Sequence, residues 1–180
     1  MANTITSYQN ILAKCQKLFL EKHQDYGTSW RIMRLPTITD QIYIKAKRIR
    51  TIQEKGTQAI ADNIESEFIG IINYAIIALI QIEIITKPSI DLTNEAVKNL
   101  YEAQKNTNQE LLANKNHDYG EAWRDMRISS MTDLILMKIL RLKQIENNEG
   151  KTIASEGIDA NYRDMLNYAV FCLIKLEENV

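Results

Sequence analysis

The chain has 180 residues, of which 45% are hydrophobic and 25% charged, and its formal net charge is −1. These values are ordinary for a globular protein of one or two small domains. The lack of an excess of positive charge argues against a nucleic-acid partner. The sequence contains only 6 Gly and 2 Pro, which favours helices over a turn-rich β fold.

The first predicted helix covers residues 7–23, where apolar side chains from Ile11 to Phe19 recur at helical spacing. Gly27 is a plausible stop for this helix. Cys15 in this helix and Cys172 near the other end do not occupy matching positions, and the first ten residues lack a basic segment followed by an apolar one. We therefore expect a cytoplasmic protein without a disulfide framework.

The second predicted helix opens at Thr37, with Asp40 three residues later in the arrangement of a capping box. An apolar stripe from Ile38 to Ile52 indicates a buried face, and Gly56 ends the helix. In the second half of the chain, Ser130 and Asp133 take the places of Thr37 and Asp40.

The third predicted helix begins after Asp62 and runs to about Ile85. Its apolar run, "FIGIINYAIIALIQIEIIT", is long enough to suggest a membrane span. The run contains Asn73, Gln81 and Glu83, however, so we interpret it as a buried core helix and expect no membrane partner.

The chain is a tandem repeat. Residues 22–34 read "KHQDYGTSWRIMR" and residues 115–127 read "KNHDYGEAWRDMR", with eight of thirteen positions identical. Residues 8–52 share 17 identities in 45 positions with the residues 93 positions later. After one extra residue near Asn147, residues 53–83 share 8 identities in 31 positions with the residues 94 positions later. A linker, "TKPSIDLTNEA", joins the halves, and Thr93 starts the second one.

We predict an all-α fold of about six helices. It consists of two three-helix units, residues 1–90 and 91–180, packed as one co-folded bundle around a pseudo-twofold axis. Whether two such chains pair again as a homodimer is left open.

Packing alone does not explain the polar and aromatic residues that both halves share. They are the candidates for binding a ligand or a phosphate group: Lys22, Asp25, Tyr26, Trp30, Arg31, Arg34, Lys45, Arg48 and Asn73 in the first half, and Lys115, Asp118, Tyr119, Trp123, Arg124, Arg127, Lys138, Arg141 and Asn167 in the second.

Lys45 and Arg48 are three positions apart and share one face of the second helix, and their counterparts repeat the pair. Two cations on one face suit a phosphate or a cluster of carboxylates. The alternative is a structural ion pair with Asp25 or Asp40.

Trp30 and Tyr26 are either core anchors or rings that stack on a base, with Arg31 and Arg34 nearby for phosphate. Asn73 lies inside an apolar helix and must be hydrogen-bonded. Its partner is a backbone group, the same residue across the pseudo-twofold axis, or a ligand, and we favour a structural partner.

Acidic side chains at helix starts serve either the helix terminus or a hard cation such as Mg²⁺. Asp164 adds a carboxylate where the first half has Gly70. The candidates for a metal site are Asp25, Asp40, Glu65, Asp118, Asp133, Asp159 and Asp164.

Three motifs recur in both halves: K-x-x-D-Y-G-x-x-W-R-x-M-R, then T-D-x-I with K-x-x-R, then N-Y-A. Together they resemble the bacterial family DUF1599, also called nucleotide modification associated domain 1, over nearly the whole chain. The resemblance implies an association with nucleotide metabolism.

The chain also resembles, more distantly, the all-α nucleoside triphosphate pyrophosphohydrolases of the MazG and dimeric dUTPase type. That resemblance implies Mg²⁺ held by an E-x-x-E and an E-x-x-D motif on neighbouring helices. The sequence departs from this pattern, because its second helix offers Asp40, Lys45 and Arg48 instead of E-x-x-E.

We therefore predict a protein that binds a nucleotide or another phosphorylated small molecule, with Mg²⁺-dependent pyrophosphohydrolysis as an open extension. The alternative is a non-catalytic structural or interaction protein whose buried ion pairs join the two repeats. Convergence of Asp25, Lys45 and Arg48 on an open cleft would favour the ligand, and their pairing under a closed surface would favour the alternative.

Overall fold

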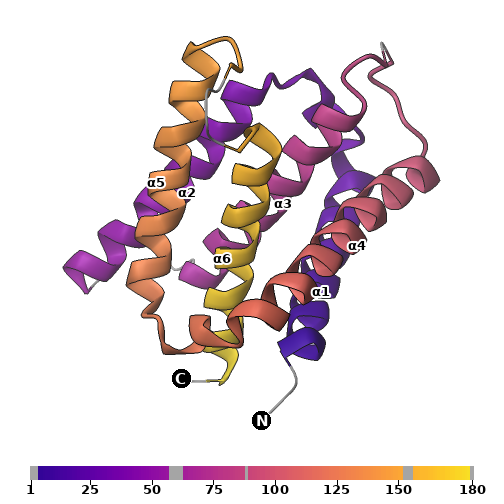
Figure 1. Ribbon diagram of the computed structural model, residues 1–180. Helices are drawn as coiled ribbons and strands as arrows, with labels where there is room; N and C mark the ends of the chain where they lie inside the picture. Colours follow the sequence, from indigo (N-terminus) through magenta and orange to yellow (C-terminus); the bar gives the residue numbers. More distant parts are fainter. Residues whose placement is uncertain (1–3, 57–62, 88, 152–155, 179–180) are drawn as a thin grey trace.

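The computed structural model describes residues 4–56, 63–87, 89–151 and 156–178, without the side chains of 115–119. Within these residues the regular secondary structure is entirely helical (Figure 1). The all-α prediction is therefore confirmed for these residues. The elements are α1 (Thr4–Tyr26), the 3₁₀ turn η1 (Ser29–Ile32), α2 (Leu35–Lys55), α3 (Ile64–Glu83), α4 (Asn94–Tyr119), the 3₁₀ turn η2 (Ala122–Asp125), α5 (Ile128–Asn147) and α6 (Ile158–Glu178).

Four of these helices, α2, α3, α5 and α6, pack against one another in the centre of the molecule. The helices α1 and α4 lie side by side and cover α3 and α6, as Figure 1 shows on its right-hand side. The helix order α1–α2–α3 repeats as α4–α5–α6, so the fold has the two three-helix units that the sequence predicts. The predicted boundary between residues 90 and 91 lies between α3 and α4.

The predicted capping of the second helix at Thr37 is wrong. Helix α2 begins two residues earlier, at Leu35, after Arg34 in an extended conformation, and Pro36 lies in its first turn. Proline suits this place because the first N–H groups of a helix have no partner within it. Helix α5 likewise begins at Ile128, so Ser130 does not cap it either.

The predicted helix stops are confirmed. Gly27 and Gly56 have φ angles of 61° and 67°, a left-handed conformation that glycine adopts without strain. The amide of Gly56 donates to the carbonyl of Ile52 over 2.8 Å. At the start of α3, the Asn63 side chain accepts a hydrogen bond from the amide of Ser66 over 3.1 Å and caps the helix.

Helix α3 is long and apolar enough to cross a membrane by length and composition, with a mean hydropathy of 1.4 over its most apolar window. In the structure it lies between α2, α4 and α6, and 61% of that window is buried inside the molecule. Phe68, Ile72 and Ile76 are completely buried. Its interpretation as a core helix agrees with this packing.

A hydrogen-bond exchange across the pseudo-twofold axis joins the halves. Tyr8 on α1 donates to Asn167 Oδ1 on α6 over 2.6 Å, and Tyr101 on α4 donates to Asn73 Oδ1 on α3 over 2.9 Å. The amide of Asn73 also donates to the backbone carbonyl of Cys15 over 3.1 Å. Asn73 thus has structural partners, as favoured from the sequence, and each half anchors the other.

A reciprocal pair of salt bridges links α2 to α5. Asp40 lies 2.8 Å from the Lys143 ammonium, and Asp133 lies 3.3 Å from the Arg50 guanidinium. The two acidic residues are counterparts in the repeat, and so are the two cations. Asp40 and Asp133 therefore join the halves instead of capping a helix.

Replacing Tyr8 by Phe is expected to lower the free energy of unfolding at pH 8 by about 1–1.5 kcal/mol, because the buried hydroxyl that donates to Asn167 and accepts from Asn108 is lost. This difference in unfolding free energy between the wild type and the variant should shrink as the pH rises. Burial raises the pKa of Tyr8 above its usual value of about 10. The stabilising contribution of neutral Tyr8 is therefore fully present below pH 10. Above pH 10, the wild type loses about 1.4 kcal/mol more unfolding free energy than the variant for each pH unit.

Urea unfolding at several pH values measures both effects, and the two stabilities should meet near pH 11. A gap that stays constant from pH 8 to pH 11 would show that Tyr8 does not stay neutral in the folded protein.

Candidate functional site

A cavity of about 470 Å³ lies between the end of α1, η1, α2 and α3. All of its lining residues lie between Leu18 and Ile77 and so belong to the first half of the chain. Five of them are ligand candidates from the sequence: Lys22, Tyr26, Trp30, Lys45 and Asn73. The structure thus brings together residues from three helices and a turn that the repeat pattern alone had singled out.

The inner wall of the cavity is aromatic and carries polar atoms without partners. Trp30 is 9% exposed, and its ring lies 6.3 Å from that of Phe19. The indole nitrogen of Trp30 and both ring nitrogens of His23 are buried and have no hydrogen-bond partner in the described part of the chain. Buried polar atoms are nearly always hydrogen-bonded in native proteins. These three nitrogens are therefore available to a bound molecule or to water.

Local backbone geometry sets the position of this wall. Helix α1 ends at Gly27, whose amide donates to the carbonyl of His23 over 2.8 Å. The short turn η1 follows at once and turns Trp30 inward, while the amide of Met33 closes the turn on the carbonyl of Trp30 over 3.1 Å. His23 and Trp30 are thereby held on either side of one bend in the chain.

Lys45 brings a positive charge to the cavity from α2. Its ammonium lies 3.3 Å from the Glu67 carboxylate on α3 and 6.0 Å from the centre of the Tyr74 ring. Arg48 also donates to Glu67. The ion pair considered from the sequence therefore exists, but its acidic partner is Glu67 and not Asp25 or Asp40.

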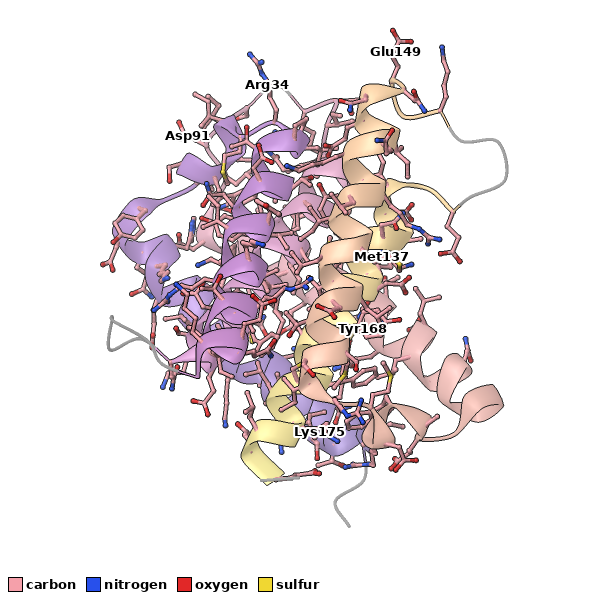
Figure 2. The ribbon with its side chains drawn as sticks, turned by 90° about the vertical axis from the view of Figure 1, so that its left-hand side faces the viewer. Arg34, Asp91, Met137, Glu149, Tyr168 and Lys175 are labelled. Carbon is pink, nitrogen blue, oxygen red and sulfur yellow. The ribbon has the colours of Figure 1, made fainter. Side chains whose placement is uncertain are left out.

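Other first-half candidates lie outside this lining. Arg31 donates to Gln81 and to the backbone carbonyl of Lys87, the latter over 2.9 Å, and so ties η1 to α3 and the linker. Asp25 is exposed at the end of α1. Arg34 is exposed and projects from the surface (Figure 2). Asp25, Lys45 and Arg48 thus do not converge as a group on one cleft.

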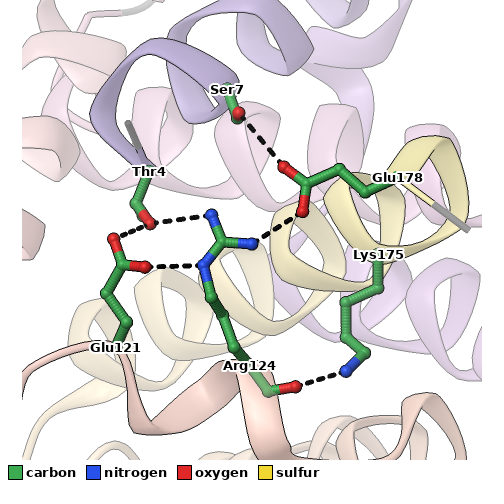
Figure 3. Close-up of polar contacts among 6 residues, drawn as sticks. All are labelled: Thr4, Ser7, Glu121, Arg124, Lys175 and Glu178. Atoms are coloured by element: carbon green, nitrogen blue, oxygen red, sulfur yellow. Dashed lines mark hydrogen bonds and ion pairs between the residues drawn. The ribbon is translucent and has the colours of Figure 1, made fainter. Parts of the chain in front are cut away.

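In the second half, Arg124 is engaged with its own chain. It donates to Glu121 and to Glu178, each over 2.6 Å, and to Thr4 over 3.2 Å, while Lys175 donates to its backbone carbonyl (Figure 3). These contacts fix η2 to both ends of the folded chain. They give Arg124 a structural role of the same kind as that of Arg31.

The remaining second-half candidates are dispersed. Lys138 is bound to Asp164 over 2.5 Å, Trp123 packs on Phe171, and Asn167 belongs to the exchange with Tyr8. Arg127 and Arg141 are exposed. The side chains of Lys115, Asp118 and Tyr119 lie outside the described part of the structure.

The acidic candidates do not fit a Mg²⁺ site within the described residues, where no group of three His, Cys, Asp or Glu side chains comes together. Asp40, Asp133 and Asp164 each pair with a cation, and Glu65 accepts a hydrogen bond from Asn63. Asp25 and Asp159 are exposed on different helices, and the side chain of Asp118 is not described.

Comparison with known proteins identifies the family of the chain. A family model described as nucleotide modification associated domain 1, or DUF1599, matches the chain twice, at residues 22–82 and 115–176. The chain belongs to this family. It carries two copies of the domain, which correspond to the two repeats recognised in the sequence. No curated protein and no solved structure matches the chain.

Three residues in or beside the cavity of the first nucleotide modification associated domain are not among the candidates from the sequence: His23 and Gly70 line it, and Glu67 contacts Lys45. His23 is replaced by Asn116 in the second domain, Glu67 by Asn161, and Gly70 by Asp164. The ligand candidates were chosen because they are identical in both repeats, so positions that differ between the repeats were left out. The one signal of this kind in the sequence is the exchange of Gly70 for Asp164, and it concerns only that position.

Proposed function

We propose that the first nucleotide modification associated domain binds a nucleotide in the cavity formed by α1, η1, α2 and α3. The observation that carries the proposal is the pair of unpartnered polar rings, His23 and Trp30, buried in a cavity that two lysines also line. A base can stack on an aromatic ring and receive hydrogen bonds on its edge, and lysine suits a phosphate.

The chemistry of the lining supports this class of ligand. Phe19, Tyr26, Trp30 and Tyr74 contribute four aromatic rings, and the volume of about 470 Å³ lies within the usual range for a small-molecule site. Lys22 is exposed whereas His23 and Trp30 are buried. A phosphate would therefore face the solvent side and a base the interior.

Binding, and not hydrolysis, is proposed. The carboxylates that a Mg²⁺-dependent pyrophosphohydrolase would need lie apart within the described residues. The family description speaks of association with nucleotide modification and names no reaction.

A structural role is the second candidate, and the reciprocal salt bridges of Asp40 and Asp133 favour it. It accounts for several polar identities between the copies. It does not account for the buried nitrogens of His23 and Trp30, which no residue of the described chain satisfies.

A thermal-shift screen tests the proposal with nucleoside mono-, di- and triphosphates, each compared with the free nucleoside and with inorganic phosphate. Because a ligand that binds only the native state stabilises it by mass action, about 2.7 kcal/mol is expected at 100 times Kd. Neither free nucleoside nor phosphate should match the nucleotide. If no nucleotide at millimolar concentration raises the melting temperature, the proposal fails.

Lys22→Ala is expected to weaken nucleotide binding about 5–10-fold, because it removes a charge-assisted contact worth roughly 1–1.4 kcal/mol on the open side of the cavity. The matched control is Lys17→Ala, on the same helix and exposed but outside the lining. The control should bind within about twofold of the wild type. Calorimetric titration distinguishes the two, and equal affinities for both variants would remove Lys22 from the site.

A further inference from the structure

The two domains differ at the position that faces the shared lysine of their second helices. In the first domain, Gly70 leaves room for the Lys45 side chain: a Cβ atom added there would lie 2.5 Å from Lys45 Cε and 2.7 Å from Cδ. The φ angle of Gly70 is not one of the positive ones. A side chain at position 70 would therefore displace the end of the Lys45 side chain, and the backbone conformation does not require glycine there.

In the second domain, Asp164 occupies that place and holds the lysine. The Asp164 carboxylate lies 2.5 Å from the Lys138 ammonium, and the Lys138 side chain is only 9% exposed, against 27% for Lys45. Lys45 also shares its carboxylate, Glu67, with Arg48. The charge of Lys138 is thus matched at closer range and is less accessible than that of Lys45.

The tryptophan of the second domain, like its lysine, is less accessible to a ligand than its counterpart in the first domain. Trp123 stacks on Phe171, with the ring centres 4.4 Å apart and the planes 8° apart, and the Arg124 guanidinium lies over it at 4.6 Å. In the first domain the counterpart of Phe171 is Ile77, which lines the cavity. Side chains of the chain itself therefore cover Trp123, whereas Trp30 borders open space.

We infer that each chain has one nucleotide site, in the first domain, and that the residue at position 70 or 164 is a determinant of which domain binds. The inference rests on the proposed function, and it adds the stoichiometry and the selecting residue. Among the described residues of the second domain, Asp164 neutralises the lysine, and Phe171 with Arg124 covers the tryptophan, so these two side chains are not offered to a ligand.

The two tryptophans give one reporter for each domain. The chain contains 2 Trp, and the indole N–H of each is buried and has no hydrogen-bond partner among the residues that the structure describes. Proton–nitrogen correlation spectra should show two indole signals, assigned with Trp30→Phe and Trp123→Phe. The probes are adenosine, guanosine, cytidine and uridine 5′-triphosphate, titrated separately into the full chain, with calorimetry for the stoichiometry.

A binding triphosphate is expected to shift the Trp30 signal, leave the Trp123 signal in place, and give one site per chain. Shifts of both signals with two sites per chain would overturn this inference and leave nucleotide binding intact. A shift of Trp123 alone would overturn the assignment to the first domain. If neither signal moves and no heat is released, both the inference and the proposed function fail.

Gly70→Asp transfers the second-domain residue into the first domain and is expected to weaken binding at least tenfold. An unchanged Trp123 signal and far-ultraviolet circular dichroism would show that the variant is folded. The reverse change, Asp164→Gly with Phe171→Ile, should make the Trp123 signal respond to the triphosphate. Unchanged affinity in folded Gly70→Asp would overturn position 70 as a determinant, whatever the reverse variant does.

Discussion

Residues 1–90, expressed alone, are expected to form no stable monomer. In the full chain, Tyr8 of the first half is completely buried and bonds to Asn108 and Asn167 of the second half. Helix α3 packs against α6 of the second half as extensively as against α2 of its own half. Removing the second half would expose this core, and a unit of about 90 residues buries too small a fraction of its surface to compensate.

The same reasoning predicts that the halves complement each other. Mixing residues 1–90 with residues 91–180 in equal amounts should restore the helical circular dichroism and a cooperative melting transition, because each half provides the other's partners. The control is the full chain cut by a protease at a site introduced into the linker between α3 and α4. In this control the halves should remain associated.

Sedimentation and thermal unfolding of residues 1–90 alone test whether this half forms a stable monomer. A monomer of residues 1–90 that melts cooperatively would show that each domain folds independently, and the contacts across the pseudo-twofold axis would then be secondary. Self-association of residues 1–90 at high concentration would agree with the expectation, because a second copy can take the place of the missing half.

Much of the fold can be predicted from the sequence because both repeats carry the same pattern of helices and helix ends. The helical spacing from Ile11 to Phe19 and the stops at Gly27 and Gly56 are local signals, and all appear in the structure. Thr93, predicted to start the second half, lies just before α4 and accepts a hydrogen bond from the amide of Ala96. The start of α2 was missed because Thr37 and Asp40 look like a capping box. Proline at position 36 is itself typical of a first helical turn, and it was the better signal.

The site was harder to predict, for a physical reason. Residues that both copies share include those that join them across the pseudo-twofold axis, such as Asp40, which pairs with Lys143, and Tyr8, which bonds to Asn167. Asp40, Tyr8 and Asn167 are identical to their counterparts in the other copy. Identity between copies therefore selects interface residues along with ligand residues. The features that set the first cavity apart, His23 and Gly70 among them, are those that the copies do not share.

Glu67→Gln is expected to lower stability and to strengthen nucleotide binding. Glu67 is 8% exposed, and both Lys45 and Arg48 contact its carboxylate. The neutral amide would leave two partly buried cations without this counter-charge. Breaking a fully buried ion pair costs about 3–5 kcal/mol, and because the two cations keep about a quarter of their side-chain exposure we expect roughly 2–3 kcal/mol.

The expected gain in nucleotide affinity follows from the same contact between Glu67 and Lys45. Lys45 lines the cavity, and in the free protein Glu67 offsets part of its charge at 3.3 Å. Without the carboxylate, a phosphate would gain the full attraction of the lysine, and we expect about 3–10-fold tighter binding. Saturating nucleotide should then recover part of the lost stability by mass action.

Glu65→Gln is the matched control, because Glu65 is exposed in the same first turn of α3 and does not line the cavity. It should change stability by less than about 0.5 kcal/mol and leave affinity unchanged. Urea unfolding and calorimetric titration of both variants separate two roles for Glu67. If Glu67→Gln loses stability and also binds nucleotide more weakly, Glu67 positions Lys45 for the phosphate. Tighter binding means that the carboxylate competes with the phosphate for the same ammonium group.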